Sequence, residues 1–252
     1  MKAEGGERDM RWRSAAALIA TIVFVAAVLS SGQEGNVFLR EDFNDLENWR
    51  PLHFPKIKKH SVYTIEKEGD NSILRTESDA SASGLIFKKE YRVNDFPMVR
   101  WRWKVENLYQ KANPEENSGD DYPVRIYIIF KYDPEAASFG KRLKYGLAKK
   151  RYGEYPPHSS LNYVWASQNQ LKRIIANPYA SEAQMVFLEA GPEKLGRWVE
   201  EEVDVIEDYQ KAFGSKPPAV ASIAVMNDSD NTGERSVSYV DFIEVFRQPA
   251  VR

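Results

Sequence analysis

Apolar and polar side chains alternate with a period of two along most of the chain after residue 36. In residues 98–105 the odd-numbered positions are valine or tryptophan, and three of the four even-numbered positions are arginine or lysine. Residues 123–132 repeat this alternation, which is typical of a β-strand with one buried face. The same reasoning predicts strands at residues 37–40, 61–66, 72–78, 83–88, 161–166, 183–189, 197–205, 220–226 and 236–246.

Two segments have a helical period instead. In residues 135–152, Phe139, Leu143 and Leu147 lie four positions apart among lysines and arginines, and a short helix at residues 206–213 stops at Gly214. About eleven strands with only two helical insertions predict an all-β sandwich or jelly roll. We expect the longer helix to cap an open end of the sandwich; contact with an anionic membrane surface is the alternative.

The first 33 residues form a separate segment with the pattern of a secretory signal. A basic start precedes an apolar core at residues 15–29, and small residues follow it. This core is shorter than the roughly 20 residues of a membrane span, which favours cleavage near residues 30–33. Because the uncharged stretch runs from Ser14 to Gln33, retention as an anchor is the alternative. We expect residues 34–252 to form one domain that is periplasmic or secreted.

Composition removes several classes of function. The chain has 252 residues, a formal net charge of −2, three histidines and no cysteine. The absence of cysteine excludes disulfides, thiolate metal sites, a cysteine nucleophile and a lipidated N-terminus. Without a basic excess, nucleic acid is not an expected partner.

Five short stretches occur in a characteristic order: Trp101 to Trp103, Gly119 to Arg125, Asn162 to Trp165, Asp208 to Gly214 and Asn227 to Gly233. Together they resemble a bacterial envelope family known as domain of unknown function family 3047. The resemblance covers about residues 37–247. It implies a secreted or periplasmic β-sandwich, similar in architecture to jelly-roll lectins and carbohydrate-binding modules, and it implies no catalytic residue.

Two acidic loops are candidates for cation or ligand binding. Asp228, Asp230 and Thr232 offer hard oxygens of the kind that Ca²⁺ prefers, with Asp241 as a further ligand. A tight turn with Gly233 at positive φ is the alternative. The other loop contains Asp120 and Asp121, which precede a buried strand. These two carboxylates could bind a cation or sugar hydroxyls; the alternatives are a solvated turn and an ion pair with Arg125.

Cationic and aromatic side chains suggest a saccharide surface. If the strands at 98–105 and 123–132 are neighbours, Arg100, Arg102 and Arg125 share a sheet face with Tyr127 and form a binding surface for an acidic polysaccharide. The alternative is a cross-strand charge ladder with the acidic residues of 200–204. Trp165 is the candidate stacking aromatic, whereas Trp101 and Trp103 share the apolar face of their strand and are expected in the core.

A third group of carboxylates is the only one with a catalytic interpretation. Glu202, Asp204 and Glu207 resemble the signature of a retaining glycosidase family, in which the outer two act as nucleophile and acid/base. A helix that begins at Ile206 opposes this arrangement, because it carries Glu207 off the strand. The alternative is a solvated strand face.

These observations favour a non-catalytic binding module for a saccharide or cell-envelope polymer, with Ca²⁺ as a structural ion. A polysaccharide-active hydrolase and a partner-binding envelope protein are the alternatives. Exposed aromatics beside Asp120 or Trp165 would favour the first, and a Glu202–Glu207 separation of about 5 Å the second. We expect the membrane to be a partner only through the N-terminal segment.

Overall fold

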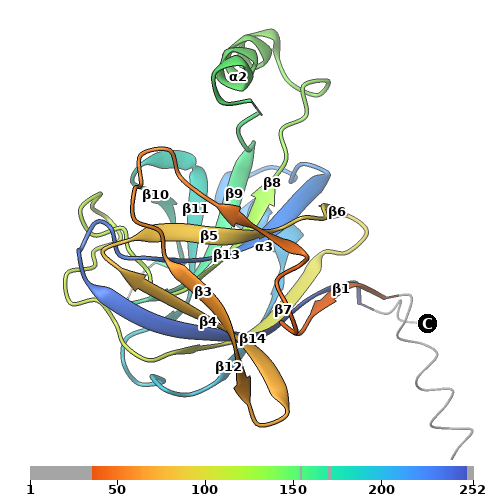
Figure 1. The fold of residues 1–252 in the computed structure, drawn as a ribbon. Coiled ribbons are helices and arrows are strands. Elements are labelled where there is room, and N and C mark those ends of the chain that lie inside the picture. Colours follow the sequence, from red (N-terminus) through yellow and green to blue (C-terminus); the bar gives the residue numbers. More distant parts are fainter. Residues whose placement is uncertain (1–35, 154, 170–171, 249–252) are drawn as a thin grey trace, which may run out of the picture.

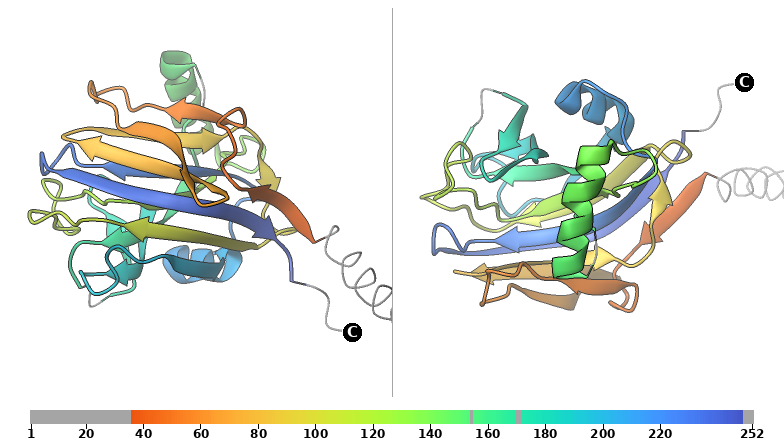
Figure 2. Two further views of the ribbon diagram at one scale, coloured as in Figure 1. Left: turned by 60° about the horizontal axis from the view of Figure 1, so that its bottom comes forward. Right: turned by 90° about the horizontal axis from the view of Figure 1, so that it is seen from above.

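Two β-sheets pack face to face in the computed structural model, which describes residues 36–153, 155–169 and 172–248 (Figures 1 and 2). The predicted all-β sandwich is confirmed, while the expected signal segment lies outside the described residues. The first sheet contains β1 (Val37–Glu41), β3 (Val62–Glu68), β4 (Asn71–Asp79), β7 (Met98–Val105), β12 (Val199–Asp204) and β14 (Arg235–Phe246). The second contains β2 (Trp49–Leu52), β5 (Ala82–Phe87), β6 (Tyr91–Arg92), β8 (Arg125–Phe130), β9 (Ser159–Ala166), β10 (Ile174–Asn177), β11 (Ala180–Ala190) and β13 (Val220–Asp228).

Strand order explains which side chains meet. The first sheet runs β12-β7-β14-β4-β3, and β1 also pairs with β14. The second runs β10-β11-β9-β8-β13-β5-β2, and β6 also pairs with β13. Its β9 and β11 are parallel, and the other described pairs are antiparallel. The strands β7 and β8 therefore belong to different sheets, so the condition for a shared cationic face of their arginines is not met.

The core lies between the sheets and is rich in aromatic rings. Trp101 and Trp103 are fully buried, as their alternation predicts. Trp165 of β9 is also fully buried, and its ring centroid lies 6.1 Å from that of Trp103. It is therefore unavailable as a stacking surface, because its ring lies in the core between the two sheets. Residues 43–245 supply every buried member of both apolar clusters, so residues 34–252 contain the whole described core.

The two helices relate to the sandwich differently. Helix α3 (Val205–Phe213) begins where Asp204 accepts hydrogen bonds from the backbone N–H groups of Ile206 and Glu207. It packs through Tyr209 against the core. Helix α2 (Phe139–Tyr152) projects from the end of the sandwich (Figure 1). Neither is long and apolar enough to cross a membrane, and no other helix occurs in the described chain.

Candidate functional site

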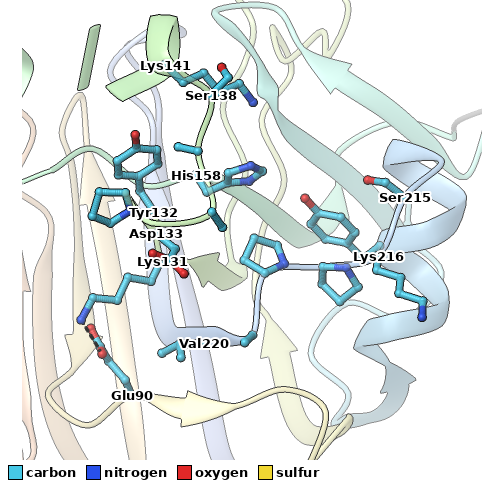
Figure 3. A pocket seen from close by; sticks show the side chains of 17 residues that line it. Glu90, Lys131, Tyr132, Asp133, Ser138, Lys141, His158, Ser215, Lys216 and Val220 are labelled. Carbon is cyan, nitrogen blue, oxygen red and sulfur yellow. Dashed lines mark hydrogen bonds and ion pairs between the residues drawn. The ribbon is translucent and has the colours of Figure 1, made fainter. Parts of the chain in front are cut away.

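A cavity of about 820 Å³ lies where β8 ends, below α2 (Figure 3). Its acidic groups have partners: Glu90 forms an ion pair with Lys131 at 2.8 Å, and Asp133 accepts a hydrogen bond from the backbone of Glu135. Burial and the charge of Lys141 lower the pKa of His158. None of the binding or catalytic residues expected from the sequence lines this cavity.

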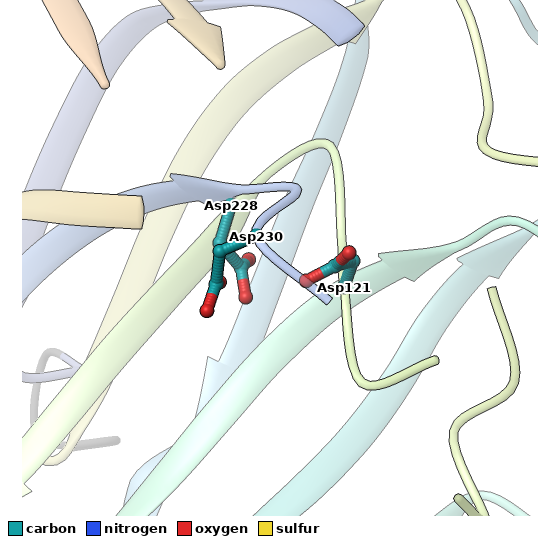
Figure 4. A group of neighbouring side chains, drawn as sticks. All are labelled: Asp121, Asp228 and Asp230. Atoms are coloured by element: carbon teal, nitrogen blue, oxygen red, sulfur yellow. The ribbon is translucent and has the colours of Figure 1, made fainter. Parts of the chain in front are cut away.

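The expected acidic residues meet at the opposite end of β8. Because β8 pairs with β13, the loop that enters β8 lies beside the loop that leaves β13. Side-chain oxygens of Asp121, Asp228 and Asp230 consequently lie within 4.8 Å of one another (Figure 4). Asp121 and Asp228 are buried, while Asp230 is exposed. The two loops that the sequence suggested separately thus form one acidic cluster, which includes Asp120.

Arg125 lies inside this cluster and is 3% exposed. Its Nε donates to Asp228 Oδ1 at 2.8 Å, and its Nη2 contacts the other oxygen of that carboxylate. Nη2 also donates to the carbonyl of Asp120 at 2.8 Å, and Nη1 lies 3.9 Å from the Asp120 carboxylate. The guanidinium therefore holds the two loops together and is not part of an open cationic surface.

Backbone N–H groups fix the third carboxylate. Asp121 accepts from the backbone and side-chain amides of Asn231 at 3.3 and 3.0 Å, and from the backbone of Thr232 at 2.6 Å. Thr232 thus contributes a backbone donor to the cluster. Asp241 does not join it: this residue belongs to the other sheet and pairs with Arg102 at 2.9 Å. Asp241 is therefore removed from the expected set of metal ligands.

The cluster holds more negative than positive charge. Four carboxylates surround one guanidinium, so its formal charge is 1 − 4 = −3 when all are ionised. Burial raises the pKa of Asp120 and Asp228, and partial desolvation raises that of Asp230. The neighbouring Asp121 adds to each of these shifts, while Arg125 opposes them. Asp120 Oδ1 is buried without a hydrogen-bond partner. This charge favours a bound cation or a proton.

An exposed aromatic ring lies next to the cluster. Tyr179 is 60% exposed, and its hydroxyl lies 2.7 Å from both the Asn117 carbonyl and Asn231 Oδ1. Asn177 donates to Asp120 Oδ2 at 2.6 Å, which connects the same turn to the acidic residues. Sequence reasoning missed these residues, since they lie outside the clearly alternating strands. The Asn-Pro-Tyr turn at 177–179 was the available signal.

The outer face of the first sheet carries the charge ladder that was the alternative interpretation of its arginines. Arg100 lies 2.9 Å from Glu244, and 3.8 and 3.9 Å from Glu200 and Glu202. Arg102 pairs with Asp241 on the same sheet. Tyr127 is half-buried in the second sheet, where its hydroxyl lies 3.2 Å from Met226 Sδ. Arg100 and Arg102 therefore share no face with Arg125 and Tyr127, because these two pairs belong to different sheets, which the sandwich core separates.

The glycosidase interpretation has little geometric support. Asp204 is the N-cap of α3, and Glu207 lies within that helix, where it pairs with Lys211 at 2.7 Å. A different carboxyl group, Glu201, lies on the inward side of β12 between Val199 and Val203. Burial, together with Glu189, raises its pKa to about 7. Strict alternation from Val199 would have identified Glu201 as the inward residue.

Comparisons with known proteins found one family match and several similar solved structures. No curated protein matches the sequence. The chain is similar to the family 11 carbohydrate-binding module of the Clostridium thermocellum cellulase Lic26A-Cel5E, with 10% identity and a TM-score of 0.42, over 85% of this chain and 95% of that one. It is also similar to the xyloglucanase domain of NopAA from Sinorhizobium fredii, with 9% identity and a TM-score of 0.41, over 79% and 93%.

A third similar structure is endoglucanase 3 of Trichoderma harzianum, from family GH12, with 6% identity and a TM-score of 0.37, over 80% of this chain and 99% of that one. Identities this low transfer no site residue to the present chain. The family match is different in kind, because it covers residues 47–244, most of the chain. The chain therefore belongs to the family described as protein of unknown function (DUF3047).

Proposed function

We propose that this protein is a non-catalytic binding module for a saccharide or cell-envelope polymer, and that the ligand lies on Tyr179 beside the acidic cluster. The supporting observation is the exposed ring of Tyr179 next to amide and carboxylate groups. A sugar ring packs its C–H face on an aromatic side chain, while its hydroxyls hydrogen-bond to amides and carboxylates. This is the combination that distinguishes the binding module from the other two hypotheses.

We propose further that Asp121, Asp228 and Asp230 bind Ca²⁺. The support is the convergence of three carboxylates, the formal charge of −3, and the buried Asp120 oxygen without a hydrogen-bond partner. Ca²⁺ takes six to eight oxygen ligands and tolerates irregular geometry, which suits a cluster built from two loops. The ion would keep the loop of Asn231 in place, and Asn231 in turn contacts the Tyr179 hydroxyl.

The periplasm or the cell exterior is the proposed location. The expected secretory signal at residues 1–33 supports it, and saccharide polymers are available as ligands there.

Native affinity electrophoresis of residues 34–252 tests the binding function. Gels contain neutral or acidic polysaccharides, with Ca²⁺ or with a chelator. We expect one polymer to retard the protein, Tyr179→Ala to abolish the retardation, and Tyr179→Phe to retain most of it, because the ring is kept. Phe139→Ala, which removes an exposed ring on α2, is the matched control. Failure of every polymer to retard the protein, or normal retardation of Tyr179→Ala, would overturn the proposal.

The ion has its own test. Ca²⁺ should raise the melting temperature of the wild type, and Asp230→Asn should remove this shift. Asp230 is exposed, so its replacement by the isosteric amide is compatible with folding. An equal Ca²⁺ shift in the variant would exclude Asp230 as a ligand.

A further inference from the structure

Helix α2 carries an exposed apolar stripe. Phe139, Leu143 and Leu147 are 79%, 59% and 61% exposed, and their spacing of four places them along one side of the helix. Only six large hydrophobic residues are exposed in the described chain, and these are three of them. The helix was expected to cap an open end of the sandwich, but its apolar stripe faces solvent.

Cations surround the stripe, and the helix contains no acidic residue. At 3.6 residues per turn, Arg142 falls on one flank, Lys144 on the other, and Lys150 at the end of the stripe. The full set of helix cations is Lys141, Arg142, Lys144, Lys149, Lys150 and Arg151.

The opposite side of the helix is attached to the body of the protein. The Tyr145 ring stacks on Tyr132, with centroids 4.1 Å apart and an angle of 25° between the planes. The Tyr145 hydroxyl donates to the Pro157 carbonyl at 3.3 Å. Tyr145 is about 200° around the helix from the middle of the stripe, from the 3.6-residue turn. These contacts therefore hold the helix with its apolar stripe facing outward.

We propose that α2 docks this face on an anionic lipid bilayer. Interfacial helices bury an apolar stripe at the boundary of headgroups and acyl chains, while flanking lysines and arginines reach the lipid phosphates. Three large apolar residues give only weak binding by themselves, so attraction between the cations and the anionic headgroups supplies much of the affinity. Charge complementarity selects this partner, because Arg142, Lys144 and Lys150 lie beside the stripe and the helix contains no acidic residue to oppose an anionic surface.

This contact is additional to any membrane association of the N-terminal segment. It is also independent of the saccharide proposal, since neither Tyr179 nor any residue of the acidic cluster belongs to α2.

Vesicle co-sedimentation of residues 34–252 tests the proposal without the N-terminal segment. Vesicles contain either equimolar phosphatidylglycerol and phosphatidylcholine or phosphatidylcholine alone, at low salt. We expect binding to the anionic vesicles only, and loss of binding at high salt. The triple variant Phe139→Gln/Leu143→Gln/Leu147→Gln should bind at least about tenfold more weakly, because it removes the apolar contact and keeps good helix formers. Arg142→Gln/Lys144→Gln/Lys150→Gln should also bind weakly, because it removes the attraction to the anionic headgroups and keeps the apolar stripe.

Matched controls lie elsewhere on the surface. Val62→Gln removes an exposed apolar side chain from β3, and Lys56→Gln/Lys58→Gln removes two exposed cations from a loop. Both should bind like the wild type, and near-ultraviolet circular dichroism should show that every variant is folded. Absence of wild-type binding to anionic vesicles would overturn the proposal and leave a protein partner as the occupant of the stripe. Equal binding of the wild type and the triple variant would also overturn it.

Discussion

At one end of β8, Arg125 is buried among four carboxylates; at the other end, the sequence of α2 contains six cations and no carboxylate. The first arrangement is closely hydrogen-bonded, because a buried charge is stable only with partners. The second tolerates like charges because water screens the exposed cations, among them Arg142, Lys144 and Lys150. Charge at the acidic end is therefore part of the fold, whereas charge on α2 is free to serve an external partner.

Removal of the central cation should have the largest effect. Arg125→Met leaves Asp228 and Asp120 buried without their counter-charge, and we expect a loss of about 3–5 kcal/mol in the free energy of unfolding. Arg142→Met in α2 should change it by less than about 0.5 kcal/mol, because that side chain is exposed. Urea unfolding measures both. Similar losses of unfolding free energy in the two variants would show that Arg125 is no more important to the fold than an exposed cation of α2.

Calcium should stabilise the acidic end in a pH-dependent way. The pKa values of Asp120, Asp228 and Asp230 are raised above the ordinary 3.8, so their protonation favours the folded state. This contribution is complete below pH 3.8 and is lost as pH rises through the folded-state pKa values. Because Ca²⁺ competes with these protons, its stabilisation should grow with pH and reach about 2.7 kcal/mol at a hundredfold excess over Kd.

Thermal unfolding from pH 4 to 8, with Ca²⁺ or a chelator, measures this effect. A Ca²⁺ effect that is independent of pH would show that the ion does not compete with protons at the cluster.

Glu201 is a partly buried carboxyl group that has no contact with Arg125, so its pKa shows the effect of burial without that guanidinium. Its pKa of about 7 is raised from 4.5 by burial and by Glu189, with Lys194 in opposition. The stability that protonated Glu201 contributes is complete below pH 4.5 and is lost as pH rises through 7. Glu201→Gln should lack this loss and be more stable than the wild type above pH 7, by about 1 kcal/mol after solvent screening. Parallel stability curves of the two proteins against pH would contradict this assignment.

Loosening of α2 should have the smallest global effect. Tyr145→Ala removes the ring stacked on Tyr132, and we expect a loss of about 1 kcal/mol, confined to the helix. Hydrogen exchange should accelerate in residues 139–152 and remain unchanged in β8. Leu143→Ala, at an exposed position on the same helix, is the control. Faster exchange throughout the sandwich would show that α2 supports the core.

Local patterns predicted most of the fold. The predicted strand at Met98–Val105 has the observed bounds, and both helices occur, although α2 begins at Phe139 instead of residue 135. The missed strands β2, β6 and β10 have two to four residues, too few for a visible alternation. Alternation identifies the two faces of a strand but does not identify its neighbours.

That distinction determined how much of the site could be predicted. Both acidic loops were identified, and an ion pair of Arg125 was one stated alternative. Their meeting depends on Asp228, which lies 103 positions from Arg125 and forms its main ion pair. The pairing of β8 with β13 creates that contact, and no local pattern records it. The same gap led to the wrong common face for β7 and β8.

The start of α2 gives this segment an unusual response to its surroundings. Ser138 makes no side-chain cap, the first turn contains no acidic residue, and Lys141 and Arg142 lie near the positive end of the helix dipole. Gly140 and Gly146 weaken the helix further. Repulsion between like charges therefore shifts the helix–coil balance toward coil, and dissolved salt or a nearby anion shifts it back. Residues 139–152 should become more helical as ionic strength rises, so the conformation of this segment should depend on the salt concentration around the protein.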